Sequence, residues 1–244
     1  MDYCGISDIG KVRKINQDVC SVAYDAPSGI ALLVVCDGMG GAKAGNIASD
    51  IAAGAFMEAV KERLVVNANI IDIMQMMNEA SRLANTRVYE RSVGDSDCAG
   101  MGTTLVAAAV SPGGTVVLNI GDSRAYHVTK SGITQVTKDH SVVEDMIDRG
   151  DLTRQEASSH PNRNLITRAL GTSPETEPDF FFINLSDGEH LLLCSDGLSN
   201  VVPEQVLFEE ITAGQPVEQT CRRLIDLSLG RGAPDNVTAV LLRK

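Results

Sequence analysis

Residues 30–41 read IALLVVCDGMGG. The apolar run 30–36 has the length and the aliphatic, β-branched composition of a buried or half-buried strand. It stops at Asp37-Gly38, and aspartate is unfavourable inside strands, so Asp37 marks a strand end. The sequence therefore predicts a core strand that carries a carboxylate at its C-terminal end.

Further runs of the same kind follow along the chain, separated by segments with helical periodicity. Apolar residues recur three to five positions apart over 46–64 and 70–88, which predicts two consecutive helices. Pro203 and Pro216 are placed to open a third and a fourth helix, and Gly230 and Gly232 to close the last one. The other predicted strands are 103–110, 115–120, 124–128, 180–185, 189–194 and 236–242.

Helices that come in pairs cannot both be crossovers of a doubly wound parallel sheet, because that architecture alternates one strand with one helix. The pattern therefore favours an α+β fold with antiparallel sheet. No Ser/Pro/Gly-rich linker and no charge block separates the elements. We expect one domain that spans residues 1–244.

Composition excludes several classes of protein. The chain has 244 residues, 43% of them apolar, which is typical of a soluble globular protein. Its longest apolar run is far shorter than the roughly 20 residues of a membrane span, and its amino terminus lacks an apolar signal core. We therefore expect a cytoplasmic protein without a membrane partner. A net charge of −11, with no cluster of Lys and Arg, argues against a nucleic-acid partner.

Aspartates recur at the ends of the predicted strands. Asp37, Asp122 and Asp196 each follow an apolar run, and Asp235 stands just before the last one. Converging carboxylates repel one another unless a cation lies between them. Mg²⁺ and Mn²⁺ bind carboxylates, backbone carbonyls and water, and a glycine after the aspartate would let the chain turn sharply and offer its carbonyl. One Asp-Gly pair is more often an ordinary turn, but repetition at strand ends favours a metal site.

The segment before residue 20 adds two candidates. Asp18 is a fifth carboxylate that could reach a metal directly or through a bound water. Arg13 offers a planar fork of donors that suits phosphate oxygens. By itself, such a pair near the amino terminus is more often part of a solvated loop.

With these residues assembled, the chain resembles the protein phosphatase type 2C family, the metal-dependent Ser/Thr phosphatases, in its compact bacterial form. The resemblance covers essentially the whole chain and rests on short motifs in the family's order. They are Gly10-x-x-Arg13-x-x-Asn16-Gln17-Asp18, Val35-Cys36-Asp37-Gly38-Met39-Gly40-Gly41, Gly102-Thr103-Thr104, Asn119-x-Gly121-Asp122-Ser123-Arg124, Asp139-His140-Ser141, Ile166-Thr167-Arg168-Ala169-Leu170-Gly171, Cys194-Ser195-Asp196-Gly197-Leu198 and Pro234-Asp235-Asn236.

The resemblance implies a four-layer αββα sandwich, in which two antiparallel sheets are flanked by pairs of helices. It implies two Mn²⁺ or Mg²⁺ ions, with Asp37 bridging them and the Gly38 carbonyl on one of them. Asp196 and Asp235 would complete the other site, and Asp18 would act through water.

The same resemblance implies that Asp122, with Asp196, holds a weaker third cation and that Arg13 binds the substrate phosphate. The reaction would be hydrolysis of phosphoserine and phosphothreonine in proteins by a metal-bridging hydroxide, without a phosphoenzyme. The expected partners are phosphorylated proteins and a Ser/Thr protein kinase whose action the enzyme opposes. We expect a monomer.

The chain departs from some family members in having Met39 and Ala42 where they have histidine, so no protein side chain is assigned as the proton donor and metal-bound water is the default acid. His140 and His160 flank an expected mobile segment over the site, and structural roles are favoured for them.

A cysteine-dependent phosphatase is excluded because no cysteine has arginine six residues later. The alternative from another class is a catalytically silent phosphoprotein-binding regulator, which would be expected to lose metal carboxylates.

Overall fold

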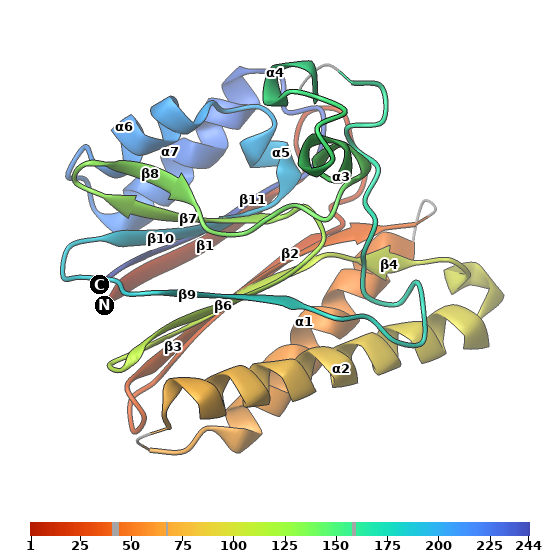
Figure 1. Cartoon of the computed structure of the whole chain (residues 1–244), viewed down its shortest axis with the longest axis horizontal. Helices are drawn as coiled ribbons and strands as arrows, with labels where there is room; N and C mark the ends of the chain where they lie inside the picture. Colours follow the sequence, from red (N-terminus) through yellow and green to blue (C-terminus); the bar gives the residue numbers. More distant parts are fainter. Residues whose placement is uncertain (41–43, 67, 158–159) are drawn as a thin grey trace.

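The structure, a computed structural model, describes residues 1–40, 44–66, 68–157 and 160–244. Two antiparallel sheets are stacked face to face, and a pair of helices covers the outer face of each (Figure 1). The predicted α+β sandwich of four layers is therefore confirmed. One sheet has the order β1 (Asp2–Asp8), β11 (Val237–Arg243), β10 (His190–Cys194), β7 (Arg124–Thr129), β8 (Gly132–Gln135). The other has the order β2 (Asp18–Asp25), β3 (Ile30–Met39), β5 (Leu105–Ser111), β6 (Gly114–Ile120), β9 (Asp179–Ile183), with β4 (Gly102–Thr103) beside β3.

The long helices follow the predicted pairs. Helices α1 (Ala44–Arg63) and α2 (Ile70–Gly94) cover the β3 sheet, while α6 (Glu204–Ile211) and α7 (Val217–Gly230) cover the β11 sheet (Figure 1). The shorter helices are η1 (Ser96–Cys98), α3 (Val142–Asp148), α4 (Arg154–Ala157) and α5 (Asp196–Ser199). Within the described ranges, no helix has the length and apolar character needed to cross a membrane.

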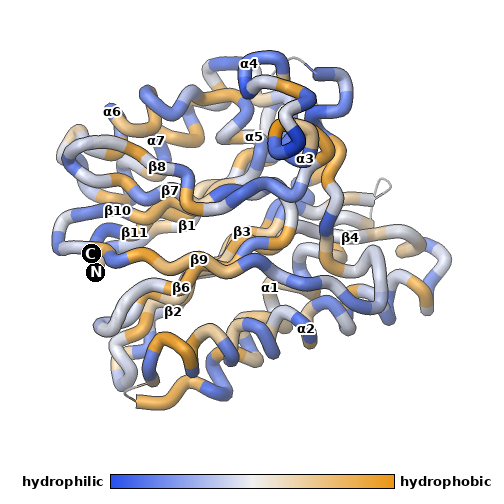
Figure 2. Tube along the Cα trace, viewed as in Figure 1, coloured by the Kyte–Doolittle hydropathy of each residue, from blue (hydrophilic) through white to orange (hydrophobic). Residues whose placement is uncertain are grey.

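Strand β3 explains why residues 30–36 are apolar without interruption. Side chains alternate between the faces of a strand, and both faces of β3 are covered. Figure 2 shows apolar residues gathered along the strands between the two helix layers. One face, Ile30, Leu32, Val34 and Cys36, packs under α1 and α2, and the other, Ala31, Leu33 and Val35, packs between the two sheets.

The structure contains strands that the apolar pattern did not predict. Strands β1 and β2 are more polar, and their residues are mostly half-buried or exposed, because each lies at the edge of its sheet. Strand β1 pairs with β11, so the first and last strands are neighbours and the two termini lie at one end of the sandwich (Figure 1).

One predicted boundary needs correction. The predicted strand 103–110 is interrupted at Thr104, where the chain leaves β4 and enters β5. The segment between His140 and His160 includes the short helices α3 and α4.

Candidate active site

A pocket of about 250 Å³ lies where strands from both sheets end. Strand β10 ends beside the start of β7, with Cys194 opposite Arg124, and the loop before β11 reaches the same edge. The opposing sheet contributes the end of β3 and the start of β2. The pocket is lined by Arg13, Gln17, Asp37, Gly38, Met39, Gly40, Thr104, Asp122, Asn164, Ile166, Asp196, Asp235 and Asn236.

The topology explains why residues far apart in sequence meet in this pocket. Strands β1 and β11 pair from Asp2↔Arg243 to Asp8↔Val237, so the loop after β1 emerges beside the loop before β11. That pairing brings Arg13 to Asp235, and their side chains form an ion pair at 2.7 Å. Every predicted site residue except Asp18 therefore lines one pocket.

Asp37 is held in place by the break between β4 and β5. Its backbone N–H donates to the Thr104 hydroxyl at 2.9 Å. Its carbonyl oxygen accepts from the Thr104 N–H and the Thr103 hydroxyl, each at 2.9 Å. The main chain that carries this carboxylate is thus bound on both sides, as a rigid ligand requires.

Gly38 lies in the strand and does not form the sharp turn that was predicted after Asp37. It continues β3 and does not adopt the left-handed backbone, so that prediction is wrong. A Cβ at this position would lie 2.1 Å from the carbonyl oxygen of Gly45 and 2.7 Å from that of Gln17. Glycine is required there because the first turn of α1 packs directly against the strand.

Asp18 lies beneath the pocket, paired with Asp37 across β2 and β3. Its Oδ2 accepts hydrogen bonds from the hydroxyls of Ser195 and Thr238, each at 2.7 Å. Its Oδ1 is buried and accepts no hydrogen bond from the residues that the structure describes. Burial raises the pKa of Asp18 to about 6, the two hydroxyls oppose that shift, and nearby carboxylates add to it. A buried carboxylate oxygen without a donor fits a role as acceptor for a metal-bound water.

The other carboxylates of the pocket disfavour one another's ionisation. Burial, followed by the charges of Asp18 and Asp196, raises the pKa of Asp37 well above its usual value. Burial and the charge of Asp196 raise the pKa of Asp122 to about 7. The pKa of Asp196 is also raised, by burial first and then by the charge of Asp235. Divalent cations between these groups would remove that cost.

The protein side chains do not form a closed cage for one ion. Among the residues that the structure describes, no group of three or more His, Cys, Asp or Glu side chains surrounds a single point. Asp235 is held by Arg13, and Asp196 accepts a hydrogen bond from the Asn200 amide at 3.1 Å. Mg²⁺ and Mn²⁺ usually keep several waters and need only one or two carboxylates each, so this donor set still fits them.

Asn236 positions the loop that carries Arg13. Its amide donates to the carbonyl oxygens of Ile9 and Ile15 at 2.8 and 3.1 Å. Its side-chain oxygen accepts from the N–H of Gln17 at 2.9 Å. The segment between β1 and β2 is thereby fastened to the start of β11 at three backbone groups.

Some lining residues were not assigned a role by sequence reasoning. Asn236 and Thr104 belong to motifs typical of the family, but nothing in their spacing indicates that they bind the backbone of other segments. Asn164 and Ile166 come from an irregular stretch before β9 that has no periodic signal. Met39 and Ala42 occupy the two positions where some family members have histidine. Met39 lines the pocket, and Ala42 lies outside the described residues.

Comparison with known proteins gives one consistent answer. The sequence profile "Protein phosphatase 2C" matches residues 10–227. The Ser/Thr phosphatase stp of Listeria monocytogenes serotype 4b is 32% identical over 98% of this chain and 94% of its own length. The Ser/Thr protein phosphatase PstP of Mycobacterium tuberculosis is 36% identical over 98% of this chain, which spans 44% of PstP.

Solved structures agree in fold. The Ser/Thr phosphatase of S. agalactiae superimposes with a TM-score of 0.92 at 31% identity, over 100% of this chain and 99% of that one. The catalytic domain of PstP in complex with two manganese ions gives a TM-score of 0.83 at 35% identity, over 98% and 96% of the two chains. Fold and pocket together define a metal-dependent phosphohydrolase. The chain belongs to the protein phosphatase 2C family and is a metal-dependent serine/threonine phosphatase that acts on phosphoproteins.

Proposed function

We propose that the pocket residues hold two divalent cations, with Asp37 bridging them and the Gly38 carbonyl binding one. Asp196 and Asp235 complete the second position, and Asp18 acts through water. The observation that carries this assignment is the convergence of strand ends from both sheets, which gathers buried carboxylates with raised pKa values around one pocket. Positive charge between such groups favours their ionised form.

When bound, the cations supply positive charge to the phosphoryl oxygens and lower the pKa of a water so that it can attack phosphorus near neutral pH. Arg13 lines the same pocket and is half-exposed, so its guanidinium can bind the substrate phosphate. Asp37 contributes from a main chain fixed by Thr104, so the attack geometry does not depend on a mobile loop.

The attack is direct, without a phosphoenzyme, and the leaving serine or threonine oxygen takes its proton from water. The described lining of the pocket contains no Cys, His, Lys or Tyr. Cysteine and histidine are common nucleophiles and His, Lys and Tyr are common proton donors in enzymes, and the carboxylates of this lining are assigned to the cations, which supports water in both roles.

The test is hydrolysis of p-nitrophenyl phosphate and of a phosphothreonine peptide with Mn²⁺, with Mg²⁺ and with EDTA. Turnover should require added metal and be lost with EDTA. Turnover that persists in EDTA would contradict the two-cation assignment. The same assay ranks Mn²⁺ against Mg²⁺, and a second, weaker activation phase would report the third cation that we assign to Asp122 and Asp196.

We further propose that residues 1–244 act as one catalytic domain, because segments from both sheets line the same pocket, and that the protein is a monomer. The biological role would be cytoplasmic signalling against a Ser/Thr protein kinase, since only a kinase produces the phosphoprotein substrates of such an enzyme. Size-exclusion chromatography with light scattering tests the monomer. A dimer with unchanged activity on dilution would contradict it.

A further inference from the structure

Asp122 stands at a sharp corner between β6 and β7, directly after Gly121. Gly121 has φ +111°, a conformation that favours glycine, and a Cβ there would lie 2.6 Å from Cγ2 of Thr104. Thr104 is the residue whose hydroxyl binds the main chain of Asp37. The corner that carries Asp122 is therefore packed against Thr104, the residue that fixes the main chain of Asp37.

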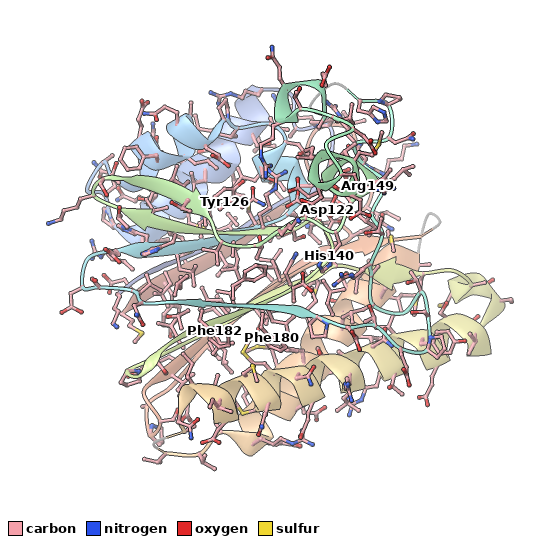
Figure 3. The ribbon with its side chains drawn as sticks, viewed as in Figure 1. Asp122, Tyr126, His140, Arg149, Phe180 and Phe182 are labelled. Atoms are coloured by element: carbon pink, nitrogen blue, oxygen red, sulfur yellow. The ribbon has the colours of Figure 1, made fainter. Side chains whose placement is uncertain are left out.

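His140 holds this corner by its side chain and its backbone. The Gly121 N–H donates to Nδ1 of the His140 ring at 3.1 Å. The Gly121 carbonyl oxygen accepts from the backbone N–H of His140 at 2.9 Å and from the Asn119 amide at 3.0 Å. His140 is only 5% exposed, so water does not compete with the ring for the Gly121 N–H. Figure 3 shows His140 and Asp122 in the loops beside α3.

The hydrogen bond from Gly121 determines the tautomer of the ring. Nδ1 accepts, so in the neutral ring the proton lies on Nε2. Nε2 is 3.2 Å from Oδ2 of Asp179, but the contact is not aligned as a hydrogen bond. Asp179 is in turn paired with Arg168 at 2.8 Å. The ring therefore has one well-formed interaction, at Nδ1, and one weaker contact, at Nε2.

The backbone of His140 also contacts the segment that contributes Ile166 to the pocket. Its carbonyl oxygen accepts from the Thr167 N–H at 2.8 Å, and its neighbour Ser141 forms a β-bridge with Ile166. Ile166 lines the pocket. These are backbone contacts, which any residue at position 140 can keep, so a substitution isolates what the ring itself does.

We propose that His140 is a positioning residue for the phosphatase reaction, whose Nδ1 fixes the Gly121 backbone so that the Asp122 carboxylate faces the cation pocket. This inference rests on the cation-binding role proposed for Asp122. His140 is not among the residues that line the pocket, and the effect passes through the Gly121 N–H.

Two substitutions separate the ring's interactions. In His140→Asn the amide oxygen occupies the place of Nδ1 and can accept from Gly121, but the contact with Asp179 is lost. In His140→Gln the polar group moves out to the place of Nε2, so the contact with Asp179 can persist while the Gly121 N–H loses its acceptor. His160→Gln is the matched control, because the His160 ring accepts a backbone N–H from Asn162 at 3.2 Å but does not line the pocket.

The measurement is Mn²⁺ binding to the substrate-free protein by titration calorimetry, together with the Mn²⁺ dependence of p-nitrophenyl phosphate hydrolysis. His140→Gln should weaken binding of the weakest cation by about 10–100-fold, the range typical of outer-shell partners. His140→Asn and His160→Gln should bind Mn²⁺ as the wild type does. In an Asp122→Asn background, His140→Gln should cause no further loss.

Equal losses in His140→Asn and His140→Gln, in step with their melting temperatures, would overturn the proposal in favour of a merely structural ring. Unchanged Mn²⁺ binding in His140→Gln would overturn it too. If Asp122→Asn binds Mn²⁺ normally while Asp37→Asn is inactive, the positioning role fails and the two-cation phosphatase stands. Loss of the metal requirement itself would instead be a failure of the proposed function.

Discussion

Single carboxylates of the pocket differ in how firmly the fold holds them. Asp37 is bound through its main chain by Thr104, and Asp196 opens the short helix α5 after β10. We expect Asp37→Asn and Asp196→Asn each to reduce kcat by more than the roughly 10–100-fold typical of an outer-shell partner. Steady-state hydrolysis at saturating Mn²⁺ measures this. Asp151→Asn, an exposed aspartate outside the pocket, is the control, and near-wild-type rates in either pocket variant would refute the ligand assignment.

Arg13 is expected to affect substrate binding more than turnover. Its side chain is 51% exposed and paired with Asp235, so removing it leaves the core intact. Arg13→Ala should raise KM for p-nitrophenyl phosphate by about tenfold, the equivalent of one charge-assisted hydrogen bond of roughly 1.5 kcal/mol. Lys14→Ala, on the same exposed loop, should leave KM unchanged. A fall in kcat at constant KM would assign Arg13 to the transition state alone.

At the scale of elements, the site depends on close contact between β3 and α1. Gly38→Ala would place a methyl group 2.1 Å from the Gly45 carbonyl oxygen, so strand and helix must separate. We expect a destabilisation of about 1–3 kcal/mol, typical of overpacking, with loss of activity because Asp37 moves with the strand. Denaturant unfolding and the phosphatase assay measure the two effects.

Gly54→Ala is the matched control within α1. A Cβ at Gly54 meets no atom within 4 Å, and helical Ala is preferred to Gly, so this change should be neutral or stabilise by up to about 1 kcal/mol. Equal stability of the Gly38 and Gly54 variants would mean that α1 and β3 tolerate separation, contrary to the packing described.

At the scale of the whole molecule, the pocket couples folding to pH and metal. The pKa is raised to about 6 for Asp18 and to about 7 for Asp122, mainly by burial. Unfolded aspartate has a pKa of about 3.9, so the folded, metal-free protein binds more protons between these values. The contribution of these groups to stability is complete below the unfolded pKa and is lost as pH rises through about 6 and 7.

Melting temperatures in EDTA should therefore fall between about pH 5 and pH 8. Saturating Mn²⁺ should raise the melting temperature most at the upper end of that range, because cations bind the ionised carboxylates of the folded state. A melting temperature in EDTA that rises over the same range would contradict the raised pKa values.

Much of the architecture was predictable because buried positions are apolar and recur along the sequence with the period of the helix or strand. Residues 30–36 are apolar at every position because both faces of β3 are covered, and α1 and α2 show helical spacing because each buries one face. Strands β1 and β2 were missed because, at sheet edges, most of their side chains contact water on one side and no apolar pattern is required. The interruption at Thr104 was missed because its cause is a hydrogen bond to Asp37, which is distant in sequence.

The sequence by itself determined the aspartates at strand ends, the paired helices and the family, since local burial and short motifs can be read along the chain. Only the tertiary structure decided that Gly38 is needed for close packing, that Asn236 fastens the Arg13 loop and that His140 holds the Gly121–Asp122 corner. Each of these depends on contacts between segments that β pairing brings together, and such distances leave no local pattern in the sequence.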